Sequence, residues 1–251
     1  YKLPDAMESR VEELILRHDQ LPVMTGGGLG RCRNGAQEMH DDYIGYLLDT
    51  IGCDLSGLRV LVDCANGAAA ATAPDLFQRL PVMADFINID PDGVNINSGC
   101  GSTHLEQLSA MTVAGKYQLG IAFDGDADRC LLVDEKGNTI DGDKIMAVCG
   151  KALRQEGKLT NNAMVATVMS NLGLHEFCRG EQIQLVCTDV GDRHVLEKMV
   201  ECDYAIGGEQ SGHMIFRQYA TTGDGELTAL QFLKALKGSG QTASELAGCC
   251  A

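Results

Sequence analysis

The stretch 120–133 constrains the fold more than any other part of the sequence. It begins and ends with short apolar runs typical of strands, and between these runs Asp124, Asp126 and Asp128 alternate with small residues. Three carboxylates so close together repel one another unless a cation lies among them. Arg129 carries a single positive charge and cannot neutralise all three, so the spacing favours a site for a hard divalent cation.

Two other interpretations of these aspartates are an EF-hand loop and a solvated turn. Together with Glu135, they also stand at positions 1, 3, 5 and 12 of an EF-hand calcium loop. That loop needs glycine at position 6, where this sequence has Arg129, and it needs a helix on each side, where this sequence has apolar strands. Aspartates in turns are often merely solvated. Three in alternation between apolar strands are better explained by metal binding.

Composition restricts the class of protein. The 251 residues carry a net charge of -15, which argues against nucleic acid and anionic membranes as partners because both attract basic surfaces. A hydrophobic fraction of 45% indicates globular domains. Neither a signal-peptide pattern nor a bilayer-spanning apolar run stands out, and the number of cysteines, eleven, is odd. We therefore expect a cytoplasmic location and reduced thiols, including Cys64, Cys130, Cys149 and Cys187 within apolar runs.

From residue 58 onward, strand patterns alternate with helix patterns. The first series predicts strands at 59–64, 82–89, 118–123 and 130–133, with helices ending near residue 80 and spanning 104–115. The second predicts helices at 141–155, 172–179, 191–201 and 224–237, and strands at 163–168, 183–187, 204–206 and 213–216. The fold class is therefore α/β, with two tandem three-layer α/β/α domains, and Asp124 follows a strand at the sheet edge where ligands gather.

The residues before these domains predict a helix at 5–18 and a linker at the glycine-rich stretch 26–30. Neither nucleotide-binding glycine pattern fits that stretch. Ser102 and His104 could form a nucleophile and its base, but residues two apart rarely align for this, so we interpret Ser102 as a helix N-cap. The stretch 221–225 is interpreted as a loop and helix cap.

Two further stretches concentrate polar groups at strand ends. In 191–194, Arg193 could bind a phosphate with its planar guanidinium, or it could be a solvated residue at a helix start. In 207–213, Glu209 and Ser211 alternate and can point the same way, as recognition of sugar hydroxyls requires, with His213 close behind them. A plain polar hairpin is the alternative for this second stretch.

At these residues the sequence resembles a known family. Asp-Gly-Asp-Ala-Asp-Arg at 124–129 is similar to the metal loop of the α-D-phosphohexomutases, and Gly-Glu-Gln-Ser-Gly-His at 208–213 is similar to their sugar-recognition loop. The stretches 95–104, 169–174 and 221–225 most resemble the bacterial branch that interconverts glucosamine 6-phosphate and glucosamine 1-phosphate. The motifs occur in the family's order along nearly the whole chain.

The resemblance implies a domain organisation. The family has four domains, and this chain would hold the middle two: 1–38 as the tail of the first domain with a linker, 39–139 as the second domain, and 140–251 as the third. The first and fourth domains would be missing partners of the same enzyme. The family's phosphoserine motif, serine-histidine-asparagine-proline, does not occur in this sequence, so the fragment alone is expected to be inactive.

The resemblance also implies site residues. Mg²⁺ would be bound by Asp124, Asp126 and Asp128, and Glu209 and Ser211 would bind a hexosamine phosphate substrate. Arg193 would assist near the metal loop, and His213 would take part in proton transfer. Phosphomannomutase or phosphoglucomutase activity remains an alternative, as does a non-catalytic two-domain protein that binds a sugar phosphate or a metal. The sequence leaves a homodimer open.

Overall fold

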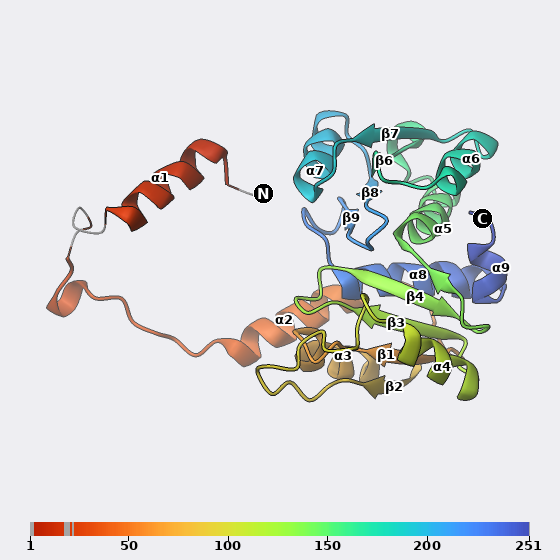
Figure 1. The fold of residues 1–251 in the computed structure, drawn as a ribbon, viewed down its shortest axis with the longest axis horizontal. Coiled ribbons are helices and arrows are strands. Elements are labelled where there is room, and N and C mark those ends of the chain that lie inside the picture. The colour runs from red at the N-terminus through yellow and green to blue at the C-terminus, as the bar shows by residue number, and fades with distance from the viewer. Residues whose placement is uncertain (1–2, 18–20, 22, 251) are drawn as a thin grey trace. The chain divides into compact units, whose positions relative to one another are not determined.

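The computed structural model describes residues 3–17, 21 and 23–250, and the chain divides into two compact units, 1–41 and 42–251 (Figure 1). In the first unit, helix α1 (Asp5–Leu16) confirms most of the helix predicted at 5–18, and residue 18 lies outside the described residues. The glycine-rich stretch expected as a linker contains one short 3-10 turn, η2 (Gly26–Gly28), and is exposed. Helix α2 (Ala36–Asp49), which the sequence patterns did not predict, leads into the second unit.

The second unit contains two mixed sheets. The first has the order β2-β1-β3-β4-β5, in which β1 pairs in parallel with β2 and β3, while β4 is antiparallel to β3 and β5. Its strands are β1 (Arg59–Asp63), β2 (Met83–Ile87), β3 (Leu119–Phe123), β4 (Cys130–Asp134) and β5 (Thr139–Ile140). All five residues of β3 are buried, as expected for a central strand covered on both faces.

The second sheet repeats this order as β7-β6-β8-β9, with β9 antiparallel to β8 and the other pairs parallel. Its strands are β6 (Ala163–Thr167), β7 (Gln184–Thr188), β8 (Ile206–Gly208) and β9 (Met214–Phe216). The helices of both series are α3 (Ala69–Gln78), α4 (Glu106–Ala114), α5 (Gly142–Gln155), α6 (Leu172–Gly180) and α7 (Asp192–Glu201), with a 3-10 turn η3 (Thr160–Asn162). The shared strand order confirms the α/β class and the similarity of the two series.

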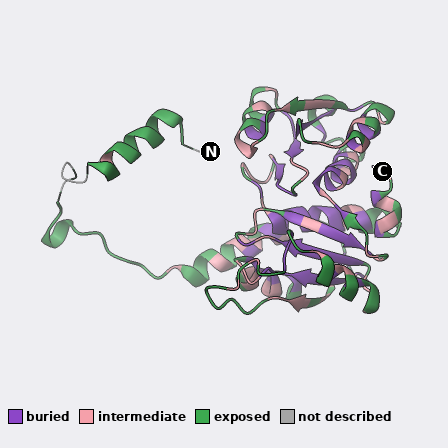
Figure 2. Cartoon of the chain, viewed as in Figure 1, coloured by how far each residue is buried: buried purple, intermediate pink, exposed green. Residues whose placement is uncertain are grey.

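Helix α8 (Gly225–Ser239) joins the two sheets, and α9 (Ala243–Ala247) follows it. Helix α8 packs against β3 and β4 of the first sheet, against β9 of the second, and against α5. It is buried along most of its length (Figure 2). One continuous core includes Val60 and Phe123 of the first sheet, Leu230 of α8 and Phe216 of the second sheet. The domain boundary between residues 139 and 140 remains a prediction. Helix α8 belongs to the second series in sequence order, but it also packs against the first sheet.

Side-chain caps begin several helices. The side chain of Asp141 accepts a hydrogen bond from the amide of Lys144 and starts α5, and Asn171 and Asp224 start α6 and α8 in the same way. The cap predicted within 221–225 is therefore confirmed. The cap predicted for Ser102 is wrong, because α4 begins after Leu105 and the amide of Ser102 donates to the carbonyl of Phe123.

All eleven cysteines are free thiols. Cys64, Cys130 and Cys149 are buried, as expected, whereas Cys187 is exposed because it lies on β7, at the edge of its sheet. Among the described residues, no helix combines the length and apolar composition needed to cross a bilayer.

Candidate metal and sugar-binding site

The three predicted metal ligands converge. Asp124, Asp126 and Asp128 form the turn between β3 and β4, and one carboxylate oxygen from each lies within 4.8 Å of the others. Asp124 and Asp128 are half-buried and Asp126 is exposed. Hard carboxylate oxygens focused on one point are the donor set that Mg²⁺ prefers, so the residues present fit such an ion.

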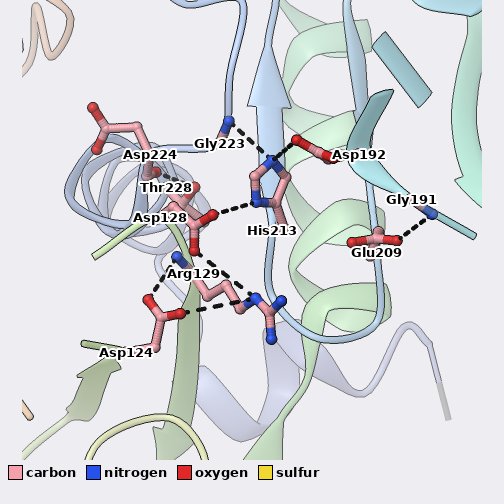
Figure 3. A network of polar contacts seen from close by, with 10 residues as sticks. All are labelled: Asp124, Asp128, Arg129, Gly191, Asp192, Glu209, His213, Gly223, Asp224 and Thr228. Atoms are coloured by element: carbon pink, nitrogen blue, oxygen red, sulfur yellow. Dashed lines mark hydrogen bonds and ion pairs between the residues drawn. The ribbon is translucent and has the colours of Figure 1, made fainter. Parts of the chain in front are cut away.

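The charges in this turn are poorly balanced by the protein itself. Burial raises the pKa of Asp124 to about 6, and the neighbouring carboxylates add to this, although a hydrogen bond from the Arg129 amide (3.1 Å) opposes it. The Nε atom of Arg129 lies 3.8 Å from an oxygen of Asp124 and 3.8 Å from one of Asp128, longer than a hydrogen bond (Figure 3). A bound cation would relieve this repulsion.

The glycine of the metal loop is required by packing. A methyl group at Gly125 would lie 2.7 Å from the side-chain nitrogen of Asn97 and 2.8 Å from Ile96. A methyl group at Gly67 would lie 2.3 Å from the carbonyl oxygen of Gly125, which also accepts a hydrogen bond from the Ala68 amide (2.9 Å). The turn after β1 and the loop around residue 97 therefore hold the metal loop by close backbone contact.

Asp63 organises this neighbourhood, and sequence reasoning missed it. It is fully buried at the end of β1 and accepts hydrogen bonds from the Ala65 amide (2.9 Å), the Asn88 side chain (3.0 Å) and the Gly101 amide (2.9 Å). Its carboxylate thus joins three loops at the edge that carries the metal turn. The sequence signal that could have identified Asp63 is a carboxylate at the end of an otherwise apolar strand.

The predicted sugar-recognition loop is the turn between β8 and β9. The Oε1 atom of Glu209 accepts a hydrogen bond from the Gly191 amide at the start of α7 (3.1 Å) (Figure 3), and Ser211 is exposed. The amide of Gly142 donates to the carbonyl of Gln210 (3.0 Å). The loop is therefore fixed at two points, while its serine hydroxyl faces solvent.

The structure brings the two loops together. The Nδ1 atom of His213 lies 3.1 Å from Oδ2 of Asp128, and His213 forms an isolated antiparallel bridge with Arg129 (Figure 3). The amide of Cys130 donates to the carbonyl of Gly212 (3.1 Å). The end of the metal turn is thus paired directly with the end of the sugar-recognition loop.

The remaining predicted site residue, Arg193, lies at the start of α7. Its Nε atom donates to Glu197 one helical turn further on (3.0 Å), and its side chain is about two-fifths exposed (39%). The Oδ2 atom of the preceding residue, Asp192, lies 3.9 Å from Nε2 of His213. The role of Arg193 stays a prediction.

A small cavity lies beside the metal loop and holds a buried acid that the sequence patterns did not single out. The cavity, about 260 Å³, is lined by Tyr43, Ala68, Thr72, Asp126, Ala127, Asp128, Gly223, Asp224 and Glu226. Glu226 is 1% exposed; one of its oxygens accepts from the Thr72 hydroxyl, and the other has no hydrogen-bond partner among the described residues. Burial raises its pKa to about 8, so the carboxyl group is protonated at neutral pH.

Gly212 allows a testable substitution at the contact between the loops. Its φ of +95° is left-handed, and a methyl group there would lie 2.4 Å from the Cys130 carbonyl oxygen. We expect Gly212→Ala to lower the free energy of unfolding by at least about 2 kcal/mol, measured by urea denaturation. Gly45→Ala is the control, because it sits in α2 with open space around it and should be neutral or slightly stabilising. Equal stability of the two variants would contradict the tight contact.

Comparisons with known proteins agree with this geometry. Residues 41–137 match the profile of phosphoglucomutase/phosphomannomutase α/β/α domain II, and residues 141–250 match that of domain III. The chain is 52% identical over 248 residues to a phosphoglucosamine mutase of Acetivibrio thermocellus and 51% identical over 249 residues to one of Caldanaerobacter subterraneus. These alignments cover 98% and 99% of this chain but 55% and 56% of the relatives, so the chain spans about half their length.

Solved structures show the same fold. A phosphoglucomutase/phosphomannomutase family protein of Burkholderia thailandensis superposes with a TM-score of 0.81 at 23% identity, covering 99% of this chain and 53% of that one. The Aspergillus fumigatus N-acetylphosphoglucosamine mutase, solved with GlcNAc-6P and magnesium, gives a TM-score of 0.67 at 19% identity, covering 85% and 53%. The profile matches and the identity of the relatives lead to one conclusion: the chain belongs to the phosphoglucomutase/phosphomannomutase family and carries its domains II and III.

Proposed function

We propose that this chain supplies the metal-binding and sugar-binding domains of a phosphoglucosamine mutase, which interconverts glucosamine 6-phosphate and glucosamine 1-phosphate. The observation that carries the proposal is the pairing of the two loops, in which three converging carboxylates lie next to the turn that holds Glu209 and Ser211. The identity to phosphoglucosamine mutases favours this activity over phosphomannomutase or phosphoglucomutase activity.

Asp124, Asp126 and Asp128 would hold Mg²⁺. When bound, the ion would neutralise phosphoryl oxygens, which is the main requirement for catalysing phosphoryl transfer. The Aspergillus relative, whose solved structure contains magnesium and a hexosamine phosphate, supports this choice of ion and substrate class. The phosphoryl group would come from a phosphoserine that lies outside this chain.

The chain's own residues would orient the sugar. Glu209, held by the Gly191 amide, would accept hydrogen bonds from sugar hydroxyls through its remaining oxygen, and the exposed Ser211 hydroxyl would add a second contact. Arg193 would place a guanidinium at the phosphate end of the substrate. By the family resemblance, a sugar bisphosphate would form from the phosphoserine and reorient in the site before it returns a phosphoryl group, and binding through a few hydroxyl contacts would allow this reorientation.

A chimera tests the proposal. Residues 1–251 would replace the matching segment of the Acetivibrio relative, and turnover of the glucosamine, mannose and glucose 6-phosphates would be compared. We expect the chimera to prefer glucosamine 6-phosphate and the isolated chain to show no turnover. The chimera with Asp126→Asn should lose at least about 99% of the activity, as expected for a lost charge ligand at a phosphoryl site.

Other outcomes would contradict the proposal in distinct ways. Turnover by the pure isolated chain would show that no outside phosphoserine is needed. A preference for mannose or glucose phosphate would support the alternative mutases. A folded chimera that binds sugar phosphate without turnover would support a non-catalytic binding protein.

A further inference from the structure

The backbone of the metal turn is held on both sides of Asp124 by other loops. The amide of Ser102 donates to the carbonyl of Phe123, the residue before Asp124, at 2.9 Å. The amide of Ala68 donates to the carbonyl of Gly125, the residue after Asp124, also at 2.9 Å. The two amides come from different loops, one leading into α3 and the other into α4. Contacts with these two loops therefore set the path of the chain at Asp124.

Asp63 anchors both of these loops. Its Oδ1 atom accepts a hydrogen bond from the Ala65 amide (2.9 Å), and its Oδ2 atom accepts one from the Gly101 amide (2.9 Å). Ala65 lies in the same loop as Ala68, and Gly101 directly precedes Ser102. The two oxygens of one buried carboxylate are thus joined to the two loops that hold the metal turn.

The loop after β1 adopts a conformation that needs such an anchor. Ala65 and Asn66 have φ values of +55° and +48°, which are left-handed and disfavour side chains with a Cβ atom, alanine more than asparagine. Besides the bond from its amide to Asp63, Ala65 accepts a hydrogen bond at its carbonyl from the Asn97 amide (2.9 Å). The buried acceptor at position 63 therefore helps to offset the cost of this backbone strain.

The second sheet shows what the same position needs beside a different turn. Strand β6 is the counterpart of β1, because each pairs in parallel with a neighbour on both sides. It ends at Thr167, which is buried and whose hydroxyl accepts from the Met169 amide (3.3 Å). Asp63 makes the equivalent contact with Ala65, and its second oxygen also reaches Gly101. Since a hydroxyl is enough to end β6, the carboxylate of Asp63 serves the additional loop.

We propose that Asp63 is a positioning residue for the metal turn, which fixes the backbone on either side of Asp124 and so raises the affinity of the turn for a divalent cation. The inference rests on the metal role proposed for the three aspartates. Asp63 is fully buried and accepts three hydrogen bonds from the protein, so it acts through the backbone and is not itself a ligand. Groups that orient metal ligands commonly change metal affinity 10- to 100-fold.

One substitution removes half of the anchor. Asp63→Asn keeps the size of the side chain and replaces one acceptor oxygen with an NH₂ group. Whichever way the side chain turns, either the Ala65 or the Gly101 amide then faces a donor in place of an acceptor. Thr167→Val is the matched control, because it removes a buried acceptor from the corresponding position of the second sheet. Urea denaturation would check that both variants fold.

Mn²⁺ titration of the 251-residue chain, followed by electron paramagnetic resonance, compares the variants. We expect Asp63→Asn to bind Mn²⁺ at least about tenfold more weakly than the unmodified chain, and Thr167→Val to bind within about threefold of it. Asp63→Asn retains all three carboxylates of the turn, so a purely structural role predicts that the two folded variants bind Mn²⁺ equally well. Unchanged affinity in Asp63→Asn, or equal weakening in both variants, would overturn the positioning role.

Amide hydrogen exchange, followed by NMR, needs neither a variant nor a metal. In the unmodified chain, the Ala68 and Ser102 amides should be protected to the same degree as the two backbone amides bound to Asp63, because all four belong to one set of contacts. Rapid exchange at Ala68 and Ser102, with the strand amides protected, would overturn the inference. If the unmodified chain bound no Mn²⁺, the metal role would fail and this inference with it, whereas equal Mn²⁺ binding with and without the Asp63 carboxylate would contradict the inference alone.

Discussion

Glu226→Gln should stabilise the chain at neutral pH and flatten the dependence of its stability on pH. The Glu226 carboxyl group is buried between Thr72 and the cavity beside the metal loop, and burial raises its pKa from the ordinary 4.5 to about 8. The folded chain therefore keeps a proton that the unfolded chain has already lost.

The sign follows from the linkage between proton binding and folding. Below pH 4.5 the Glu226 carboxyl group is protonated in both the folded and the unfolded state, so it does not lower the free energy of unfolding. Between pH 4.5 and 8 only the folded state binds the proton. The free energy of unfolding therefore falls as the pH rises through this window, by at most about 1.4 kcal/mol per pH unit. Glutamine imitates the protonated acid, can still accept from Thr72, and has no charge to lose.

We expect Glu226→Gln to raise the free energy of unfolding by up to about 3 kcal/mol at pH 7, and by less at pH 5. Urea denaturation at several pH values would measure this, with Glu12→Gln on the exposed helix α1 as the control. Parallel pH profiles for Glu226→Gln and the unmodified chain would show that the Glu226 carboxyl group ionises normally in the fold.

Asp124→Asn should have two effects of opposite sign. Burial and the nearby carboxylates make a negative charge at Asp124 unfavourable, as its pKa of about 6 shows. Removing the charge should therefore stabilise the metal-free chain at pH 7, by about 1–2 kcal/mol. The same change removes a ligand, so Mn²⁺ affinity should fall at least about 100-fold.

Higher stability together with weaker Mn²⁺ binding would identify Asp124 as a metal ligand. A residue kept for stability would destabilise the chain when replaced, whereas a residue kept for function often costs stability. Thermal unfolding with and without Mn²⁺ measures both effects, and the exposed Asp90→Asn is the control. A destabilised Asp124→Asn variant that still binds Mn²⁺ would contradict the assignment.

Much of the fold could be predicted from local patterns. Apolar runs such as 118–123 predicted the strands, and Asp141 and Asp224 marked the starts of helices. The alternating aspartates predicted the turn between β3 and β4 at which three carboxylates converge.

The parts that could not be predicted depend on contacts distant in sequence. Helix α8 covers both sheets, and no periodicity shows that Glu226 on its first turn will be buried against Thr72. The imidazole that contacts the Asp128 carboxylate lies 85 residues away, at His213. Serine is a common N-cap residue, but the amide of Ser102 donates to the carbonyl of Phe123 at the end of β3. This contact, distant in sequence, places Ser102 outside α4.

Crystals of this chain soaked in Mn²⁺ would show whether the three carboxylates bind one cation. Anomalous difference maps would locate the ion without any assumption about activity. We expect one peak at bonding distance from an oxygen of each of Asp124, Asp126 and Asp128. Bound Mn²⁺ elsewhere in the chain, with no peak at this turn, would contradict it.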